Sequence, residues 1–533
     1  MIHSVRGTRG IAVAPHALAA QSALDVLREG GNAVEAMIAA AATIAVVYPH
    51  MNSIGGDGFW LIHMPGRAPG VVEACGAAAA AASRDWYREQ GVGGAIPHRG
   101  GLAATTVAGT VSGWGAAYRL SRGTMRGRMP LARLLEDAIH YASRGVAVTR
   151  SQSLSTAHKQ AELADQPGFA ATFLPGGHAP AAGDIIVQKK LGATLRRIAE
   201  AGTEDFYSGD LARTVARDLA RAGSPLVLAD LESHTAVFRD PLMLTHSTGT
   251  LCNTPPPTQG LVSLLILGIL DELGIANVSP VTAEYIHLCV EAAKRAFQVR
   301  DLYITDPRYM TRDAKQLLSR GLIRELAGNI DRKHAAAWQQ PSQPGDTVWM
   351  GVIDKAGRAV SYIQSIYHEF GSGVVLPRTG ITWQNRGCSF SLDPAALNAL
   401  EPGRKPFHTL NPALAQLKDG RVMVYGTMGG DGQPQTQSAI FTRVVNYGLN
   451  PQAAVSEPRW LFGRTWGRDS ATLKLESRFD LGIVRELTER GHEMEILEPY
   501  DEAVGHAGAI VRHANGVMEG GADPRSDGAV AAY

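Results

Sequence analysis

The chain has 533 residues, of which 45% are hydrophobic and 19% are charged, and its formal net charge is +1. This composition is ordinary for a globular protein. A near-neutral chain with acids and bases mixed along it gives no sign of a nucleic-acid or membrane partner, so we expect neither. At about 150 residues per domain the length would allow three or four domains, although larger single cores exist.

Cysteine and histidine usage argues against disulfides and metal chemistry. The cysteines form no Cys-x-x-Cys pair, and the 17 histidines are scattered without a metal-type spacing, so we expect no metal and no other cofactor. So few cysteines in so long a chain fit a reducing compartment. The four cysteines, which we expect to be buried and inert, are Cys75, Cys252, Cys289 and Cys388.

The apolar segments are too short for targeting or membrane insertion. Residues 1–15 contain no stretch that could serve as a signal peptide. The longest apolar run, residues 36–48, is too short to cross a bilayer and predicts a buried core helix. We therefore expect a cytoplasmic protein.

In chain order, the first predicted elements are two helices. A helix-period apolar pattern covers residues 16–29 and stops at the pair Gly30-Gly31. Asn32 lies three residues before Glu35, which is the spacing of a capping box and predicts the start of the second, Ala-rich helix.

A glycine-rich segment, residues 53–58, follows and leads into a predicted strand at 59–63. It lacks the Gly-Lys-Ser/Thr ending of a phosphate-binding loop, so we expect a tight turn there. From about residue 105 to 330 the pattern is mostly helical. The segments with helix spacing are 131–143, 190–201, 209–222, 261–273, 281–301 and 314–327.

A change of character marks residues 333–346, which are polar and contain two prolines and a glycine. The pattern alone is also that of an ordinary surface linker. Residues 347–353 and 359–366 then have strand composition, and the turn 354–358 joins them. The sequence thus predicts a hairpin whose first strand begins at a threonine, directly after a polar loop.

That threonine, Thr347, has a chemical use only if it becomes a chain terminus. A threonine hydroxyl is a weak nucleophile without a base. A free α-amino group has a pKa of about 7.7–8.0, so an N-terminal threonine carries both nucleophile and base. The chain would first have to be cut between Asp346 and Thr347. A lone threonine before a strand is usually structural, so this hypothesis needs further support.

Four sequence segments, in the order in which they occur along the chain, support the hypothesis that Thr347 is a nucleophile. Residues 30–62, 293–307, 346–374 and 425–432 resemble the conserved blocks of the gamma-glutamyltranspeptidase family of N-terminal-nucleophile hydrolases. The resemblance implies an α/β (α+β) fold, a four-layer αββα sandwich of two sheets between helical layers. It also implies that 1–346 and 347–533 are cleavage products that share one core, as a heterodimer that could assemble further into a homo-oligomer.

The resemblance also assigns roles to individual positions. Thr347 falls on the family's nucleophile, and Ser365 falls where the family has a threonine that hydrogen-bonds the nucleophile hydroxyl. Gly429 and Gly430 fall on the pair whose N–H groups form the oxyanion hole, a role that suits glycine because its backbone can approach developing charge closely. The alternatives are a plain strand serine and a tight turn.

The chain departs from the family pattern where the family grips glutamate. Val72 stands in the place of the arginine that binds the α-carboxylate, and Ser389 stands in the place of the aspartate that binds the α-amino group. Arg386 is a gained cation, and arginine binds carboxylates bidentately. The alternative for Arg386 is a structural salt bridge.

Four further positions fall in the expected substrate pocket. The predicted substrate-binding residues, besides Arg386, are Tyr367, Asn385, His408 and Thr409. For His408 the alternative is a satisfied core histidine, and for the neighbouring His368 that alternative is favoured.

We therefore expect a self-processing amidohydrolase that releases ammonia from a small carboxylate amide without a free α-amino group. Two alternatives remain open at this point. One is a gamma-glutamyl hydrolase or transpeptidase with altered glutamate binding. The other is a non-catalytic protein that binds a small acid on the same scaffold.

Overall fold

Two seven-stranded sheets stacked face to face form the centre of the computed structural model, which describes residues 3–338, 345–463 and 470–533. The first sheet has the order β1 (Val5–Gly7), β18 (Met518–Ala522), β17 (Ala507–Arg512), β13 (Val422–Thr427), β12 (Ala413–Leu417), β9 (Gly249–Asn253) and β8 (Leu242–His246). The second has the order β19 (Ala529–Ala532), β2 (Gly10–Ala14), β10 (Asp346–Asp354), β11 (Ala359–Tyr367), β3 (Asp57–His63), β4 (Gly70–Ala74) and β7 (Val237–Arg239).

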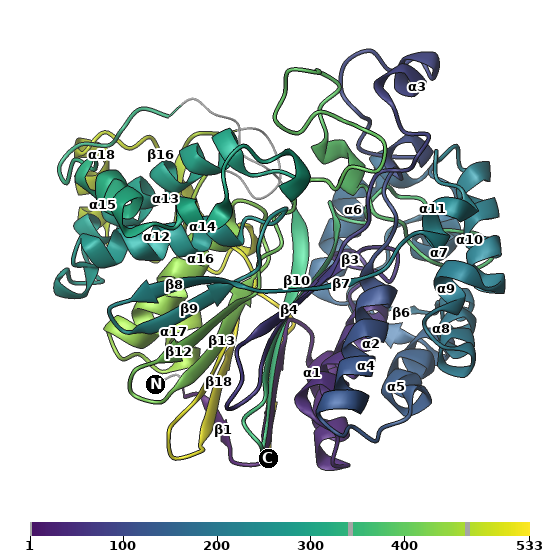
Figure 1. Ribbon diagram of the computed structural model, residues 1–533, viewed down its shortest axis with the longest axis horizontal. Helices are drawn as coiled ribbons and strands as arrows, with labels where there is room; N and C mark the ends of the chain where they lie inside the picture. Colours follow the sequence, from purple (N-terminus) through teal and green to yellow (C-terminus); the bar gives the residue numbers. More distant parts are fainter. Residues whose placement is uncertain (1–2, 339–344, 464–469) are drawn as a thin grey trace.

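Helices cover the outer face of each sheet, which completes four layers (Figure 1). The second sheet is covered by α1 (Ala17–Arg28), α2 (Ala33–Val47) and α4 (Thr110–Thr124), with α5 (Leu131–Arg144) and α8 (Lys189–Ala201) behind them. The first sheet is covered by α12 (Gly260–Glu272), α16 (Gly432–Phe441) and α17 (Pro451–Ser456), with α13 (Ala283–Tyr303) behind. The predicted αββα sandwich is confirmed.

Shorter elements complete the described chain. The helices are α3 (Arg84–Glu89), α6 (Arg150–Leu163), α7 (Phe169–Phe173), α9 (Asp205–Ser208), α10 (Asp210–Arg221), α11 (Leu228–Glu232), α14 (Ala314–Leu317), α15 (Arg320–Gly328) and α18 (Leu481–Glu489). The strands are β5 (Val146–Ala147), β6 (Ile185–Ile186), β14 (Trp460–Phe462), β15 (Leu473–Glu476) and β16 (Met494–Leu497).

The start of the chain folds as its sequence predicts. Asn32 caps α2, and the Glu35 side chain accepts a hydrogen bond from the Asn32 backbone N–H, which completes the capping box. Every residue of α2 is buried, because the helix packs between the second sheet and α1 and α5. The single helix predicted at 314–327 is wrong: α14 ends at Leu317 and α15 begins at Arg320, with the cap residues Leu318 and Ser319 between them.

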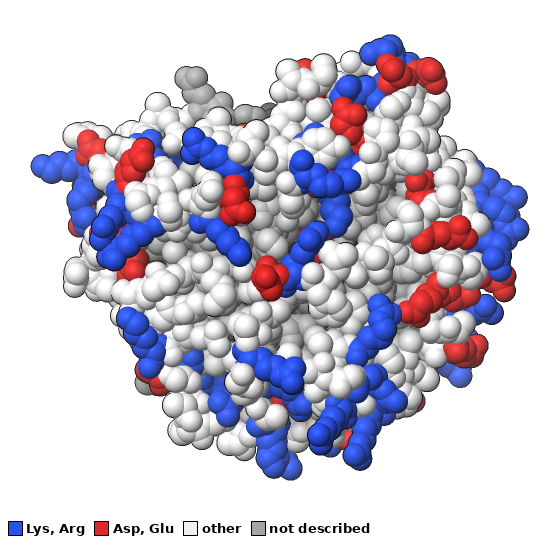
Figure 2. Space-filling view, in the orientation of Figure 1, with Lys and Arg blue, Asp and Glu red and all other residues white. Residues whose placement is uncertain are grey.

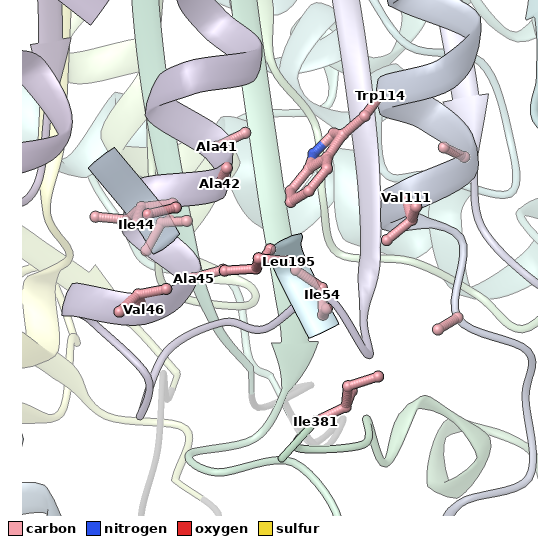
Figure 3. Packing of buried hydrophobic residues seen from close by; sticks show 14 of the residues in the cluster. Ala41, Ala42, Ile44, Ala45, Val46, Ile54, Val111, Trp114, Leu195 and Ile381 are labelled. Atoms are coloured by element: carbon pink, nitrogen blue, oxygen red, sulfur yellow. The ribbon is translucent and has the colours of Figure 1, made fainter. Parts of the chain in front are cut away.

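Three apolar layers fill the spaces between the four structural layers. One lies between the second sheet and its helices, where Figure 3 shows Trp114 of α4 projecting toward α2, which carries Ala41 and Ala45. A second lies between the first sheet and its helices. The third, between the sheets, contains Trp349, whose indole occupies space that a side chain at Gly426 or Gly508 would fill. The sheets can therefore approach closely at the strand that carries Thr347.

Each sheet contains strands from both sides of residue 346. In the second sheet β10 pairs with β2, and β11 pairs with β3. In the first sheet β12 pairs with β9. The segments 1–346 and 347–533 thus interleave, as expected for two pieces that share one core.

The mixed charges on the surface fit the near-neutral composition of the chain. Figure 2 shows acidic and basic side chains interspersed over one face, with more Lys and Arg along its lower edge. Within the described ranges, no helix combines the length and apolarity needed to cross a membrane. The cysteines are all unpaired, and Cys388 is half-buried where burial was expected.

Candidate active site

Thr347 lies at the start of β10, in a break in the strand register. Asp346 pairs with Tyr367 and Val348 pairs with Gln364, so Ser365 and Ile366 of β11 form a bulge opposite the single residue Thr347. Bulges redirect side chains and occur next to active sites. The Thr347 side chain is buried, and its hydroxyl has no hydrogen-bond partner among the described residues.

Ser365, on β11, contacts the bond that precedes Thr347. Its hydroxyl donates a hydrogen bond to the carbonyl oxygen of Asp346 and accepts one from the backbone N–H of Tyr367 at 2.8 Å. The family resemblance led us to expect a bond to the nucleophile hydroxyl instead. In the uncut chain, Asp346 pairs with Tyr367, and the Ser365 hydroxyl reaches the Asp346 carbonyl from the neighbouring bulge in β11. This hydroxyl polarises the carbonyl of the Asp346–Thr347 bond.

The side chain of Asp346 lies in a low-dielectric environment. Burial, reinforced by the charge of Glu369, raises its pKa well above the usual range. Asp346 lines one end of a cavity of about 780 Å³, together with Lys159 and Glu369. A neutral carboxyl at this point places no negative charge beside the carbonyl that must accept a nucleophile.

The glycine pair predicted as the oxyanion hole adopts backbone conformations that favour glycine. Gly429 has φ +117° and Gly430 has φ +48°. Gln259 donates through Nε2 to the carbonyls of both Gly430 and Thr409, each at 2.8 Å. Gln259 therefore holds the segment that contains Thr409 beside the turn that contains Gly429 and Gly430.

A buried ion pair supports the same turn. Arg300 Nη1 lies 2.7 Å from Asp431 Oδ1, and both side chains are nearly inaccessible. Arg300 belongs to the block 293–307 that carried the family resemblance. Arg300 therefore has a structural role, because its ion pair fixes Asp431, the residue directly after Gly429 and Gly430.

Arg386 is a buried cation that makes no ion pair with any residue the structure describes, and Asp57 is a carboxyl close enough for its charge to act on it. It is 1% exposed, and none of its three guanidinium nitrogens has a hydrogen-bond partner among the described residues. Its guanidinium lies over the ring of Tyr367, 3.9 Å from the centroid. Burial lowers the pKa of Arg386 from its ordinary value. An unpaired buried charge is costly, so a missing anionic partner is the natural interpretation.

Asp57 belongs to the same site, although the sequence did not single it out. It pairs across the strands with Ser365, and its Oδ1 accepts hydrogen bonds from the backbone N–H groups of Gly76 and Gly109. Burial raises its pKa to about 7, against the opposing charge of Arg386.

His408 lies on the other side of Asp57. The His408 Nε2 is 3.6 Å from Asp57 Oδ2, and neither ring nitrogen of His408 has a hydrogen-bond partner in the described part of the chain. Burial, followed by the charge of Arg386, lowers the pKa of His408 well below its ordinary value, so the imidazole is neutral. A satisfied core histidine does not fit these contacts.

The uncut chain lies against two predicted substrate-binding residues. A side chain at Gly345 would begin 3.2 Å from the Thr409 hydroxyl and 3.4 Å from the Tyr367 ring. The Thr409 hydroxyl is buried and lacks a partner among the described residues. The segment before the predicted cut therefore covers this part of the pocket. Of the polar linker predicted at 333–346, residues 339–344 lie outside the described residues.

The side-chain amide of Asn385 hydrogen-bonds to the backbone of two other residues, His98 and His368. Its Nδ2 donates to the carbonyl of His98 at 2.9 Å, and its Oδ1 accepts from the N–H of His368 at 3.1 Å. Both ends of the amide are thus used by the protein. Ser389, in the family's aspartate position, donates to the carbonyl of Arg386 at 2.9 Å.

Two stacked sheets between helices, with a threonine at the start of a central strand beside a polarised carbonyl, define the class of N-terminal-nucleophile hydrolases. A family model described as gamma-glutamyltranspeptidase matches residues 19–533. The chain belongs to this family, whose members are self-processing hydrolases of amide bonds.

The chain is also similar to individual proteins over nearly its whole length. The chain is 57% identical to an oxamate amidohydrolase proenzyme of Klebsiella pneumoniae over 526 residues, which cover 99% of each chain. It is 41% identical to a glutathione hydrolase-like proenzyme of Bacillus subtilis, again over 99% of each. Among solved structures, cephalosporin acylase from Bacillus halodurans superposes with a TM-score of 0.90 at 33% identity, covering 100% of this chain and 97% of the acylase.

Proposed function

We propose that the chain cleaves its own Asp346–Thr347 bond and that the resulting enzyme hydrolyses oxamate to oxalate and ammonia. The buried, unpaired guanidinium of Arg386 is the observation that carries the substrate proposal. Cleavage would yield products 1–346 and 347–533, which remain associated as a heterodimer.

Self-cleavage begins with the Thr347 hydroxyl, which attacks the carbonyl carbon of Asp346. Ser365 donates its hydrogen bond to the carbonyl oxygen as negative charge develops there. The C–N bond breaks, the nitrogen takes up a proton, and an ester links Asp346 to the Thr347 oxygen. Water hydrolyses the ester, which leaves a carboxylate on Asp346 and a free α-amino group on Thr347.

Substrate binding follows from the charges in the pocket. The carboxylate of oxamate pairs with Arg386, whose planar donors match it bidentately. Departure of the segment at Gly345 exposes Thr409 and the ring of Tyr367. The protein offers no carboxylate at position 389 to bind an α-ammonium group, which disfavours glutamyl substrates.

Catalysis then repeats the chemistry of cleavage on a different carbonyl. The α-amino group of Thr347 takes the proton of its own hydroxyl, which attacks the amide carbon. The N–H groups of Gly429 and Gly430 stabilise the oxyanion, and ammonia leaves with the proton that the amine holds. Water then hydrolyses the oxalyl ester to oxalate and regenerates Thr347.

The relative from Klebsiella pneumoniae supports this choice of amide through its printed name and its 57% identity. Oxamate hydrolysis would place the enzyme in purine and urate degradation. A cytoplasmic location remains part of the proposal, supported by the low number of cysteines.

The test is ammonia release from a panel of small amides. We expect oxamate to be turned over with the highest kcat/KM, and its methyl ester, which lacks the carboxylate, to be a poor substrate. A γ-glutamyl anilide should give little product. Efficient turnover of the anilide with none of oxamate would instead support an altered gamma-glutamyl enzyme, and binding of oxamate without ammonia release would support a non-catalytic protein.

A further inference from the structure

Three potential metal ligands meet beside the Arg386 pocket, outside the residues used for catalysis. One donor atom each from His98, His368 and Cys388 lies within 4.8 Å of the other two. The Nδ1 atoms of the two histidines are 3.3 Å apart and share a hydrogen bond that a bound ion would replace, and the rings are stacked, with centroids 5.0 Å apart and planes inclined by 17°. No sequence pattern predicts this cluster, because 270 positions separate the two histidines.

We propose that His98, His368 and Cys388 form a binding site for a zinc-class divalent ion. Two imidazole nitrogens and a thiolate are donors that Zn²⁺ prefers. Two nitrogens bound tetrahedrally at about 2.0–2.1 Å from an ion lie about 3.3–3.4 Å from each other. The observed separation of 3.3 Å therefore already matches one edge of the tetrahedron. Water would complete the coordination.

A second cluster of three potential ligands serves as a comparison, because hydrogen bonds within it and to the rest of the chain hold all of its members. His287, Glu291 and His492 also lie within reach of one ion. However, His287 Nδ1 is 2.9 Å from His492 Nε2, and His287 Nε2 is 2.8 Å from the carbonyl of Asp331.

Glu291 in that cluster is also occupied. Its carboxylate accepts from Lys294 Nζ at 2.7 Å and from the backbone N–H of Ala336 at 3.2 Å. The hydrogen bonds explain this buried cluster without a metal.

Two cations, Arg99 and Arg386, lie near the proposed site, so an ion would bind against their charge. Arg99, the basic neighbour of His98, is paired with Glu162 at 2.6 Å and also donates to the carbonyls of Glu369 and Gly371. On metal binding, Cys388 gives up its proton to solvent, so the thiolate adds a negative charge beside the ion. The half-buried position of Cys388 and the exposed position of His98 leave a path for the ion.

The site would connect the two sides of the cleavage point. His98 lies in 1–346, whereas His368 and Cys388 lie in 347–533. Asn385, which bridges His98 and His368, directly precedes Arg386. On the basis of the proposed cleavage, a bound ion would clamp the two products together at the pocket.

The experiment is calorimetric titration of the purified full-length protein with zinc chloride. We expect one ion per chain, and affinity lower by about 100-fold or more in His98→Ala and in Cys388→Ser. His140→Ala, which removes an exposed histidine on α5, is the matched control and should bind like wild type. Titration with cobalt should produce a thiolate-to-metal charge-transfer band that Cys388→Ser lacks.

Several results would overturn the proposal. They are the absence of binding, equal affinity in His98→Ala, a cobalt spectrum without the thiolate band, or loss of binding in His492→Ala alone. The titration needs no substrate. The uncut Thr347→Ala variant should also bind one ion, so failure of the metal site and failure of the proposed hydrolase are distinguishable.

Discussion

Two groups of buried charges in this protein have opposite surroundings. Arg525 lies 2.7 Å from Glu476 and 3.0 Å from Asp523, while Arg459 lies 2.6 Å from Asp523, and all four side chains are almost inaccessible. Arg386 is equally buried, yet its guanidinium has no hydrogen-bonded partner within the described ranges.

The difference separates a structural use of buried charge from a functional one. A buried charge is costly to desolvate, and only well-placed partners offset that cost. The cluster around Arg525 supplies its partners from the chain itself. The described residues around Arg386 leave its cation without an ion pair, which favours a ligand that brings a carboxylate.

The largest effect on activity is expected from substitution of the nucleophile, Thr347. Its hydroxyl, like the guanidinium of Arg386, has no hydrogen-bond partner among the described residues. Thr347→Ala should remain one uncut chain and release no ammonia from oxamate, because the hydroxyl is needed for both reactions. Denaturing electrophoresis and an ammonia assay measure these outcomes. A cut, active variant would contradict the proposed role.

Matched substitutions of the two arginines test the comparison itself. Arg386→Met should lower kcat/KM for oxamate by about 100-fold or more, because charged hydrogen bonds contribute about 1.5–3 kcal/mol each. Its stability should be unchanged or higher, since an unpaired buried charge is removed. Arg525→Met should instead lose about 3–5 kcal/mol of unfolding free energy, because Glu476 and Asp523 lose a partner.

Chemical denaturation measures the unfolding free energy of both variants, and steady-state kinetics measures their kcat/KM for oxamate. Severe destabilisation of Arg386→Met with normal kinetics in the folded fraction would show that Arg386 is structural.

Ser365→Ala should slow self-cleavage by about 100-fold, because removal of one donor to a developing oxyanion has an effect of this size. The rate is measured by following the uncut chain over time after synthesis. Ser365→Thr keeps the hydroxyl and should restore cleavage. Equal rates in Ser365→Ala and wild type would show that the hydrogen bond to Asp346 has no part in the reaction.

The smallest effect is expected at Asp57, whose pKa burial raises to about 7. As the pH rises through this value, Asp57 ionises beside Arg386 and repels the substrate carboxylate, while His408 stays neutral. The KM for oxamate should therefore increase by about 3- to 10-fold above pH 7.

Asp57→Asn, which cannot ionise, should lose this increase while the pH dependence of kcat remains. The folded state favours the protonated acid, so the stability that Asp57 contributes is fully present below its ordinary pKa of 3.8 and is lost as the pH rises through about 7. A KM profile that Asp57→Asn leaves unchanged would exclude Asp57 from the pocket's electrostatics.

Local sequence patterns predicted the elements that local forces determine. The capping box at Asn32, the buried helix α2 and the hairpin that begins at Thr347 follow from spacing and composition, and the structure contains them. The break between α14 and α15 was missed because Ser319, a good capping residue, was counted as part of a longer periodic pattern.

The rest of the site depends on contacts between distant segments. Asp57 receives a hydrogen bond from Gln384, 327 positions away, and Gln259 holds Thr409 and Gly430. No periodicity encodes such contacts. The one usable signal for Asp57 was a carboxylate inside the glycine-rich segment 53–58, where a tight turn alone needs no acid.

The central claim is that the Asp346–Thr347 bond is cut to create the nucleophile. Denaturing mass spectrometry of the active wild-type protein tests it most directly. We predict two chains, one beginning at Thr347, whose summed mass exceeds that of the intact chain by one water. A single intact chain that releases ammonia from oxamate would contradict the account.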